Sequence, residues 1–173
     1  VPGVDVTDEP ILQHPTDDDY YLTHNEFDRE SIWGAYFVPS EWNVSNVDDM
    51  YRVTVIFGHS NGNSMHKKFS VLKYFRDVNF AKEHRYIYLT LGEQQTRWKI
   101  FAVADYPIDP SYTIANPDDS YFLTEIASMK AYSYNQYATE VGLNDKVLIL
   151  STCSGSDNYD TRFIVCAKLD EVF

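Results

Sequence analysis

The sequence predicts a single, mainly β domain with two helices. Seven short runs rich in β-branched and aromatic residues are bounded by turn residues, and two stretches show helical periodicity. So few helices argue against an alternation of strands and helices, and therefore against a parallel β/α sheet. The 173 residues fit one domain, 1–173, and the 44% hydrophobic content with 16% aromatic residues is enough to fill a substantial core.

The predicted strands follow one another along the whole chain. They cover residues 11–13, 34–38, 51–57, 85–91, 97–104, 147–151 and 162–169. In the third strand Val53, Val55 and Phe57 share one face, because side chains alternate along a strand. Ile56 makes the other face apolar toward the end, so we expect this strand to lie inside the sheet and to be partly covered on its second side.

Two helices are predicted between the strands. The first covers residues 64–76, where hydrophobic residues recur at helical spacing and Ser64 can cap the start. The second covers residues 117–131, with Asn116 as its N-cap and Pro117 at the first helical position. The apolar positions are Met65, Phe69, Leu72 and Phe75 in the first helix and Phe122, Ile126 and Met129 in the second.

The charge of the chain argues against several kinds of partner. It carries 26 acidic and 14 basic side chains, and the formal net charge of -12 disfavours binding to nucleic acids or to an anionic membrane surface. No run of 18 or more apolar residues is present that could span a bilayer. Because the chain begins at Val1 without an initiator methionine, we expect a targeting or anchoring segment to precede it in the natural protein.

The main functional pattern lies at the ends of three predicted strands. Cys153 follows the sixth strand, His59 follows the third, and Arg162 begins the seventh. A thiol beside a base or a cation can form a thiolate, and a guanidinium can donate two hydrogen bonds to a carbonyl oxygen or an oxyanion. The second cysteine, Cys166, lies inside an apolar run and is expected to be a buried free thiol.

Each of these residues also has an ordinary structural explanation. Taken alone, Cys153 can be a buried thiol, His59 can cap a turn, and Arg162 can form a surface ion pair with an aspartate of its own loop. The small polar loop that follows Cys153 favours an exposed position at a strand end instead. The acidic cluster at 17–19 lacks the glycine and the terminal glutamate of a calcium loop, so no metal site is expected.

Further motifs accompany these residues in a fixed order. Gly-His stands at 58–59 and Leu-Ser-Thr-Cys at 150–153, with an arginine nine residues after the cysteine. Asp-Tyr-Tyr-Leu-Thr-His at 19–24 and Gly-Ala-Tyr-Phe at 34–37 precede them, and a helix is predicted before the cysteine strand. This order resembles the class B sortases, a family of cysteine transpeptidases, over nearly the whole chain.

The resemblance implies an eight-stranded β-barrel and an enzyme without a metal or an organic cofactor. Such an enzyme cleaves the sorting signal of a surface protein after its threonine, holds the acyl group as a thioester on Cys153, and transfers it to a peptidoglycan amine. It also implies that His59 is the general acid and base and that Arg162 positions the substrate and its oxyanion. The residues expected to line the peptide groove are Leu22, Ile108, Tyr112, Thr113, Ser151 and Thr152.

Several alternatives remain open at this point. The sorting signal can be NPQTN-like, LPXTG-like or PPXTG-like, and the acceptor can be a cell-wall amine or a pilin subunit. A hydrolytic cysteine peptidase would use the same thiol and histidine, whereas a non-enzymatic β-rich adhesion module would use neither. The resemblance further implies a membrane-anchored protein at the outer face of a Gram-positive cell.

Overall fold

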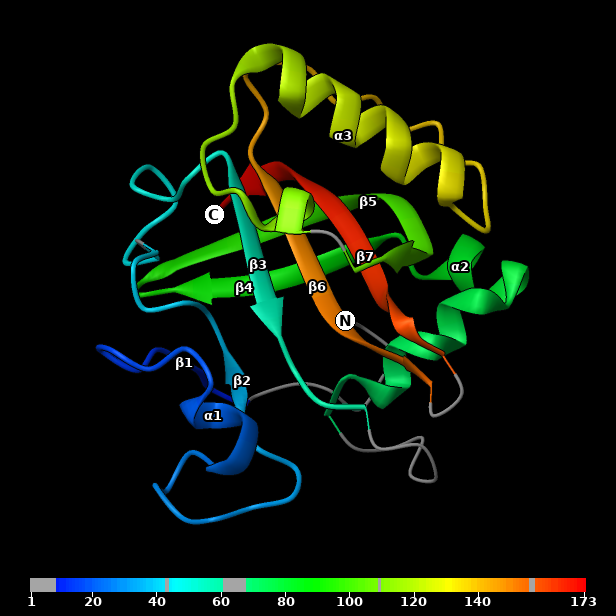
Figure 1. Ribbon diagram of the computed structural model, residues 1–173. Helices are drawn as coiled ribbons and strands as arrows, with labels where there is room; N and C mark the ends of the chain where they lie inside the picture. Colours follow the sequence, from blue (N-terminus) through cyan, green and yellow to red (C-terminus); the bar gives the residue numbers. More distant parts are fainter. Residues whose placement is uncertain (1–8, 43, 61–67, 109, 156–157) are drawn as a thin grey trace.

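The strands form one curled sheet in the computed structural model of the protein, which describes residues 9–42, 44–60, 68–108, 110–155 and 158–173 (Figure 1). Within these residues the strands are β1 (Ile11–Leu12), β2 (Tyr36–Phe37), β3 (Val53–Phe57), β4 (Tyr86–Leu91), β5 (Gln94–Pro107), β6 (Val147–Gly155) and β7 (Asn158–Val172). Their order across the sheet is β1-β2-β3-β6-β7-β5-β4. All seven predicted strands are therefore confirmed in position.

The pairing within the sheet is mixed. β1 pairs with β2 and β3 pairs with β6 in parallel, whereas the other neighbouring strands are antiparallel. β3 lies between β2 and β6, as its two apolar faces predict. The resemblance implies eight strands, while the described residues contain seven, and β1 and β4 are the two edges of this curled sheet.

Five helical segments connect the strands. They are α1 (Tyr20–Thr23), η1 (Lys68–Arg76), α2 (Val78–Glu83), η2 (Pro110–Thr113) and α3 (Asp119–Tyr132) among the residues that the structure describes. The first predicted helix corresponds to η1, a 3-10 helix, and its predicted beginning at 64–67 lies outside the described residues. Phe69, Leu72 and Phe75 are each three residues apart, and this is the repeat of a 3-10 helix.

The second predicted helix is α3, but its N-cap differs from the prediction. The N-cap is Asp118, whose side chain accepts a hydrogen bond from the Tyr121 amide at 2.9 Å. Asn116 was the wrong choice because its side chain accepts instead from the Arg52 amide at 3.0 Å, just before β3. The buried face is as predicted and consists of Phe122, Ile126 and Met129.

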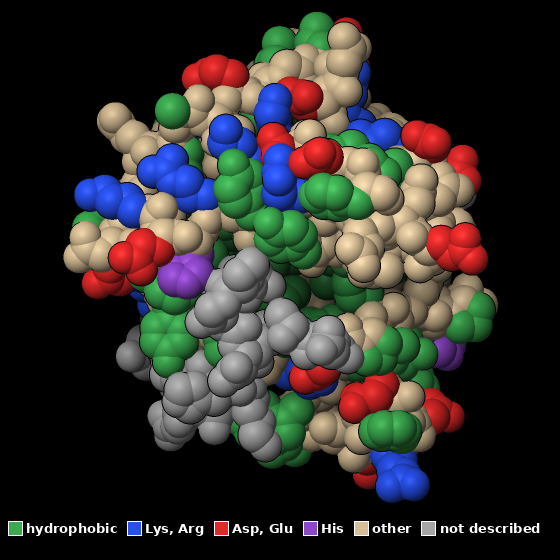
Figure 2. All heavy atoms as spheres, turned by 180° about the vertical axis from the view of Figure 1, so that it is seen from behind, with side chains coloured by type: hydrophobic (Ala, Val, Ile, Leu, Met, Phe, Trp, Pro, Cys, Tyr) green, Lys and Arg blue, Asp and Glu red, His purple; other side chains and the backbone are tan. Residues whose placement is uncertain are grey.

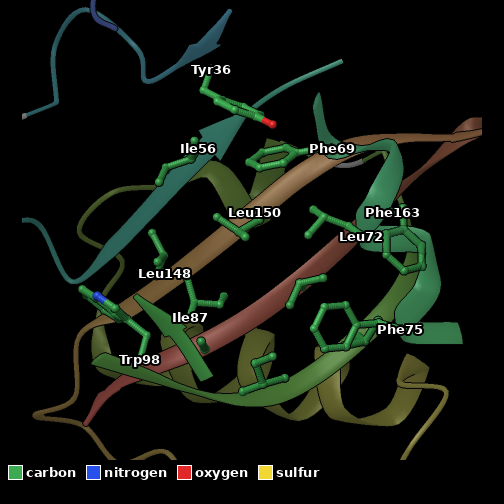
Figure 3. Packing of buried hydrophobic residues seen from close by; sticks show 14 of the residues in the cluster. Tyr36, Ile56, Phe69, Leu72, Phe75, Ile87, Trp98, Leu148, Leu150 and Phe163 are labelled. Carbon is green, nitrogen blue, oxygen red and sulfur yellow. The ribbon is translucent and has the colours of Figure 1, made fainter. Parts of the chain in front are cut away.

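Two hydrophobic cores lie on opposite faces of the sheet. Leu148 and Leu150 belong to the core under η1, whereas Val147 and Ile149 belong to the core under α3. This alternation along β6 follows from the two-residue period of a strand. Figure 3 shows the first core, in which Leu72 and Phe75 of η1 point toward the strands. β6 is thereby covered on both faces along most of its length.

The first core borders a hollow of about 830 Å³. Strands β3, β4 and β6 contribute to its walls, and Tyr36 and Phe69 also line it. A recess with hydrophobic side chains is visible on the back of the molecule (Figure 2). Among the described residues no helix has the length and the apolar character needed to cross a membrane.

Candidate active site

The three predicted catalytic residues lie at one end of the sheet, where the neighbouring strands β3 and β6 end and β7 begins. In the parallel pair of β3 and β6, Phe57 lies opposite Ser151, and the Gly58 amide donates to the Ser151 carbonyl at 3.2 Å. Two residues after Ser151, still within β6, comes Cys153, and two residues after Phe57, just beyond the end of β3, comes His59. On the other side of β6, Cys153 lies directly opposite Arg162 of β7. His59 and Cys153, which are 94 positions apart in the sequence, thus each follow by two residues a paired position of the parallel strands β3 and β6.

Cys153 and Cys166 differ in their accessibility. Both are free thiols, but Cys153 is exposed at the end of β6, whereas Cys166 is completely buried in β7. Burial raises the pKa of the Cys166 thiol far above its usual value, because a thiolate is poorly stabilised in an apolar interior. Only Cys153 of these two thiols is therefore suited to react with a substrate.

The imidazole of His59 is held by the backbone of α1. Its Nε2 atom lies 2.7 Å from the Leu22 carbonyl oxygen, and since a carbonyl only accepts, Nε2 carries the hydrogen. The carbonyl of His59 itself accepts from the Phe69 amide at 3.0 Å. Both the side chain and the backbone of this histidine are therefore fixed, and Nδ1 remains as the second nitrogen for proton exchange.

Gly34 allows α1 to approach the histidine. Its φ of +54° lies in the left-handed region, and a Cβ atom at this position would lie 2.2 Å from the Tyr21 carbonyl and 3.1 Å from Cδ2 of His59. A larger residue would therefore separate α1 from His59. The Gly-Ala-Tyr-Phe motif thus contributes a glycine that the geometry around the histidine requires.

Arg162 lies half-buried beside Cys153. Its Nη1 atom donates to the Thr161 carbonyl at a long 3.4 Å. Burial raises the pKa of the Tyr112 phenol, whereas its hydrogen bond with Ser151 and the charge of Arg162 act to lower that pKa. The guanidinium is therefore within electrostatic reach of Tyr112. Of the two loop aspartates that could pair with Arg162, Asp157 and Asp160, Asp157 lies outside the described residues.

Two of the predicted groove residues contact each other beside the cysteine. The Tyr112 hydroxyl lies 3.2 Å from Oγ of Ser151, and both side chains are buried. Ser151, Cys153 and Arg162 share the sheet face that α3 covers, because they continue the alternation of Ile149 and Ile164. Tyr112 and Ser151 therefore form a buried pair on the same sheet face as the thiol, next to Cys153 along β6.

The other predicted groove residues take different positions. The Thr152 side chain alternates to the η1 face and is buried there. Ile108, which is 48% exposed, follows β5, and Thr113 is half-buried at the end of η2. Leu22 contacts the site through its carbonyl oxygen on His59. The structure thus brings Tyr112, Ser151 and Leu22 into contacts at the site, while Thr152 faces away from the side of the thiol.

Two basic residues of η1 were not predicted. Nη2 of Arg76 donates to the Ser154 carbonyl at 3.2 Å, one residue after Cys153. Burial lowers the pKa of the Lys73 ammonium, the charge of Arg76 acts in the same direction, and the charge of Cys153 opposes them. Lys73 and Arg76 therefore lie within electrostatic reach of the thiol or its turn. Their three-residue spacing was the available signal, since it places them on one side of a 3-10 helix.

Solved structures of sortases share this fold. Sortase B from Clostridium perfringens superposes with a TM-score of 0.84 at 25% identity, covering 99% of this chain and 91% of that one. Sortase B from Listeria monocytogenes gives a TM-score of 0.82 at 25% identity, covering 98% and 90%. A substrate complex of Staphylococcus aureus sortase B has the same fold, with a TM-score of 0.84 at 20% identity over 98% of this chain and 76% of that one.

Within the sortases, the relatives belong to class B. A curated Sortase B of Listeria monocytogenes is 27% identical over 164 residues, which are 94% of this chain and 64% of that protein. The chain is therefore a class B sortase homologue that spans just under two thirds of this relative. No family model matches the sequence.

Proposed function

We propose that the protein is a cysteine transpeptidase that attaches surface proteins carrying a sorting signal to an amine acceptor. The observation that carries this proposal is the strand register, in which Cys153 lies opposite Arg162, and Ser151, two residues before Cys153, lies opposite Phe57, two residues before His59. The relation to class B sortases supports it. In this proposal residues 1–173 form one catalytic domain that acts at the outer surface of a Gram-positive cell, joined to its membrane by a segment outside this sequence.

The first half of the reaction forms an acyl-enzyme. The Cys153 thiolate attacks the carbonyl carbon of the threonine in the sorting signal, and the carbonyl oxygen becomes an oxyanion. Arg162 donates hydrogen bonds to this oxyanion. The carbon–nitrogen bond then breaks, and protonated His59 gives its proton to the departing amine. A thioester on Cys153 and a free C-terminal fragment result.

The second half resolves the thioester. An amine of a peptidoglycan precursor attacks the thioester carbonyl, and neutral His59 accepts the proton that this amine loses. The carbon–sulfur bond breaks, and the thiolate is restored together with a new amide bond. Because the Leu22 carbonyl occupies Nε2, we assign the proton transfer in both halves to Nδ1 of His59.

The peptide substrate is expected on the α3 face of the sheet. Tyr112 and Ser151 line the inner end of this surface, and Ile108 and Thr113 border it from the segment after β5. The Leu22 side chain would form the opposite border, beside His59. We propose that these five residues select the sorting signal, whether NPQTN-like, LPXTG-like or PPXTG-like.

The acyl-enzyme provides the test of this function. The protein is incubated with peptides of the three signal types, and mass spectrometry should detect an adduct on Cys153 that equals the peptide up to its threonine. Cys153→Ala should form none, whereas Cys166→Ala should form it normally, because Cys166 is buried away from the surface. His59→Ala should slow adduct formation by about 10²- to 10⁴-fold, the usual contribution of a general acid. As a matched control, His84→Ala removes a histidine that stacks on Phe80 in α2 and should keep the rate.

A thiol reagent separates this proposal from a non-enzymatic adhesion module. Iodoacetamide should modify Cys153 in the folded protein and leave Cys166 unmodified until the chain unfolds. An adduct that persists in Cys153→Ala, or a Cys153 that reacts with neither peptide nor reagent, would exclude the proposed function.

A further inference from the structure

The side chains of η1 are arranged in rows along the helix. In a 3-10 helix side chains three residues apart lie above one another, and Phe69, Leu72 and Phe75 form the row that packs into the core. The next row consists of Ser70, Lys73 and Arg76. η1 packs on both β6 and β7, and the last member of this second row, Arg76, reaches the part of β6 that directly follows Cys153.

Arg76 connects several elements at this turn. Its Nη2 atom donates to the Ser154 carbonyl at 3.2 Å and lies 3.0 and 2.9 Å from the two carboxylate oxygens of Asp105. The guanidinium carbon lies 5.0 Å from the centre of the Phe163 ring. The Tyr134 hydroxyl donates a further hydrogen bond to Asp105. Arg76 is thereby held by Asp105 of β5 and Phe163 of β7 while it donates to the Ser154 carbonyl of β6. Tyr134, which follows α3, holds Asp105 in turn.

The carbonyl that Arg76 binds belongs to an irregular part of the sheet. Cys153 is paired with Arg162 and Gly155 with Asn158, and the register shifts between these two pairs. Ser154 lies inside this irregularity, so its carbonyl is bound by a side chain where the regular strand pairing is interrupted. A bulge of this kind bends its strand and redirects the neighbouring side chains. The direction of the Cys153 thiol therefore depends on how firmly the bulge is held.

We propose that Arg76, itself held by Asp105, is a positioning residue that fixes the bulge after Cys153 and thereby the direction of the thiol toward the substrate carbonyl. This inference rests on the proposed transpeptidase function and adds a residue outside the Cys153, His59 and Arg162 set. In this role Arg76 does not contact the substrate. Its effect should therefore appear in the rate of acylation and not in peptide binding.

The kinetic test uses Arg76→Gln, Arg76→Lys and a matched control. Arg76→Gln should lower kcat for acyl-enzyme formation by roughly 10- to 100-fold, the effect of a misplacement of about 1 Å, with KM changed less than two-fold. Arg76→Lys should recover part of the loss, because an ammonium can still donate to Ser154. The control is Arg97→Gln, since Arg97 pairs with Asp170 and Glu171 and lies over the Tyr86 ring away from the site. It should keep kcat.

A second readout does not depend on catalysis. Hydrogen exchange at the amides of the β6–β7 turn should become faster in Arg76→Gln and remain unchanged in Arg97→Gln. Unchanged exchange in Arg76→Gln, a kcat within two-fold of the unmodified protein, or a rise in KM alone would each overturn the proposal. If the unmodified protein forms no thioester at all, the proposed function fails, whereas the exchange measurement still decides whether Arg76 fixes the bulge.

Discussion

The phenol of Tyr36 is buried without a hydrogen-bond partner among the described residues. Its side chain is 4% exposed and lines the hollow under the first core. Burial raises the pKa of this phenol well above its usual value, and the negative charge of Glu9 adds to the effect. The folded protein therefore keeps the phenol protonated at a pH at which the unfolded chain would release the proton. A buried hydroxyl without a partner also costs free energy at neutral pH.

We predict that Tyr36→Phe stabilises the protein, and more strongly at alkaline pH. At pH 7 the free energy of unfolding should rise by about 1 kcal/mol, since the substitution removes an unpaired buried hydroxyl. The stability linked to the protonated phenol is fully present below about pH 10 and is lost as the pH rises above it, because only the unfolded state ionises there. The gain should therefore be larger at pH 11 than at pH 7 in urea unfolding. A loss of stability at pH 7 would show that the hydroxyl has a partner.

The side chains of the proposed site could be predicted from the sequence, but the groups that hold them in place could not. His59, Cys153 and Arg162 stand at strand ends, which the alternation of apolar residues reveals. The group that holds His59 is the backbone carbonyl of Leu22, and a backbone group has no signature in the sequence. The resemblance to class B sortases predicted Leu22 as a groove residue, whereas the contact that the structure shows is made by its carbonyl oxygen on His59.

Among the elements, α3 is a helix that one side chain caps at its start and that covers one of the two hydrophobic cores. Asp118 has an extended backbone conformation and its carboxylate accepts from the Tyr121 amide. The helix then buries Phe122, Ile126 and Met129 against the strands. The stability of α3 on the sheet therefore depends on this cap, which lies outside the proposed catalytic residues.

We predict that Asp118→Ala lowers the free energy of unfolding by about 1 kcal/mol, the usual cost of losing an N-cap. Asp118→Asn should retain most of this stability, because an amide oxygen also accepts the hydrogen bond. Thermal unfolding followed by circular dichroism measures both, and the rate of thioester formation should be unchanged in each. An equal loss in the Asn and Ala variants would contradict the assignment of Asp118 as the cap.

The elements that the sequence did not predict are the short ones. α1 has four residues and α2 has six, so neither completes the two turns over which helical periodicity becomes visible. β5 and β7 are longer than predicted because they pair with each other nearly from end to end, beyond the regular apolar pattern. The predicted first helix is a 3-10 helix, and the strict three-residue spacing of its core residues is the signal that distinguishes it.

At the scale of the whole molecule, one curled sheet serves both stability and the proposed chemistry. β6, like β3, β5 and β7, has residues in both cores, and it carries the exposed Cys153 near its end, between β3 and β7. The exposed thiol therefore follows a buried stretch of β6, which holds its position in the sheet. The positions of the strands follow from the apolar pattern of the sequence, whereas the mixed order of the sheet depends on pairings between distant segments that periodicity does not contain.

The proposed function predicts that an amine and water compete for the acyl group of the thioester. The most direct measurement follows a fluorescent sorting-signal peptide with the protein and increasing concentrations of a glycine-based amine, with chromatographic separation of the products. The proposal predicts that the ligated product rises with the amine concentration at the expense of the hydrolysed one, and that neither product forms in Cys153→Ala. Cleavage with a product distribution that the amine leaves unchanged would contradict transpeptidation and identify a hydrolytic peptidase instead.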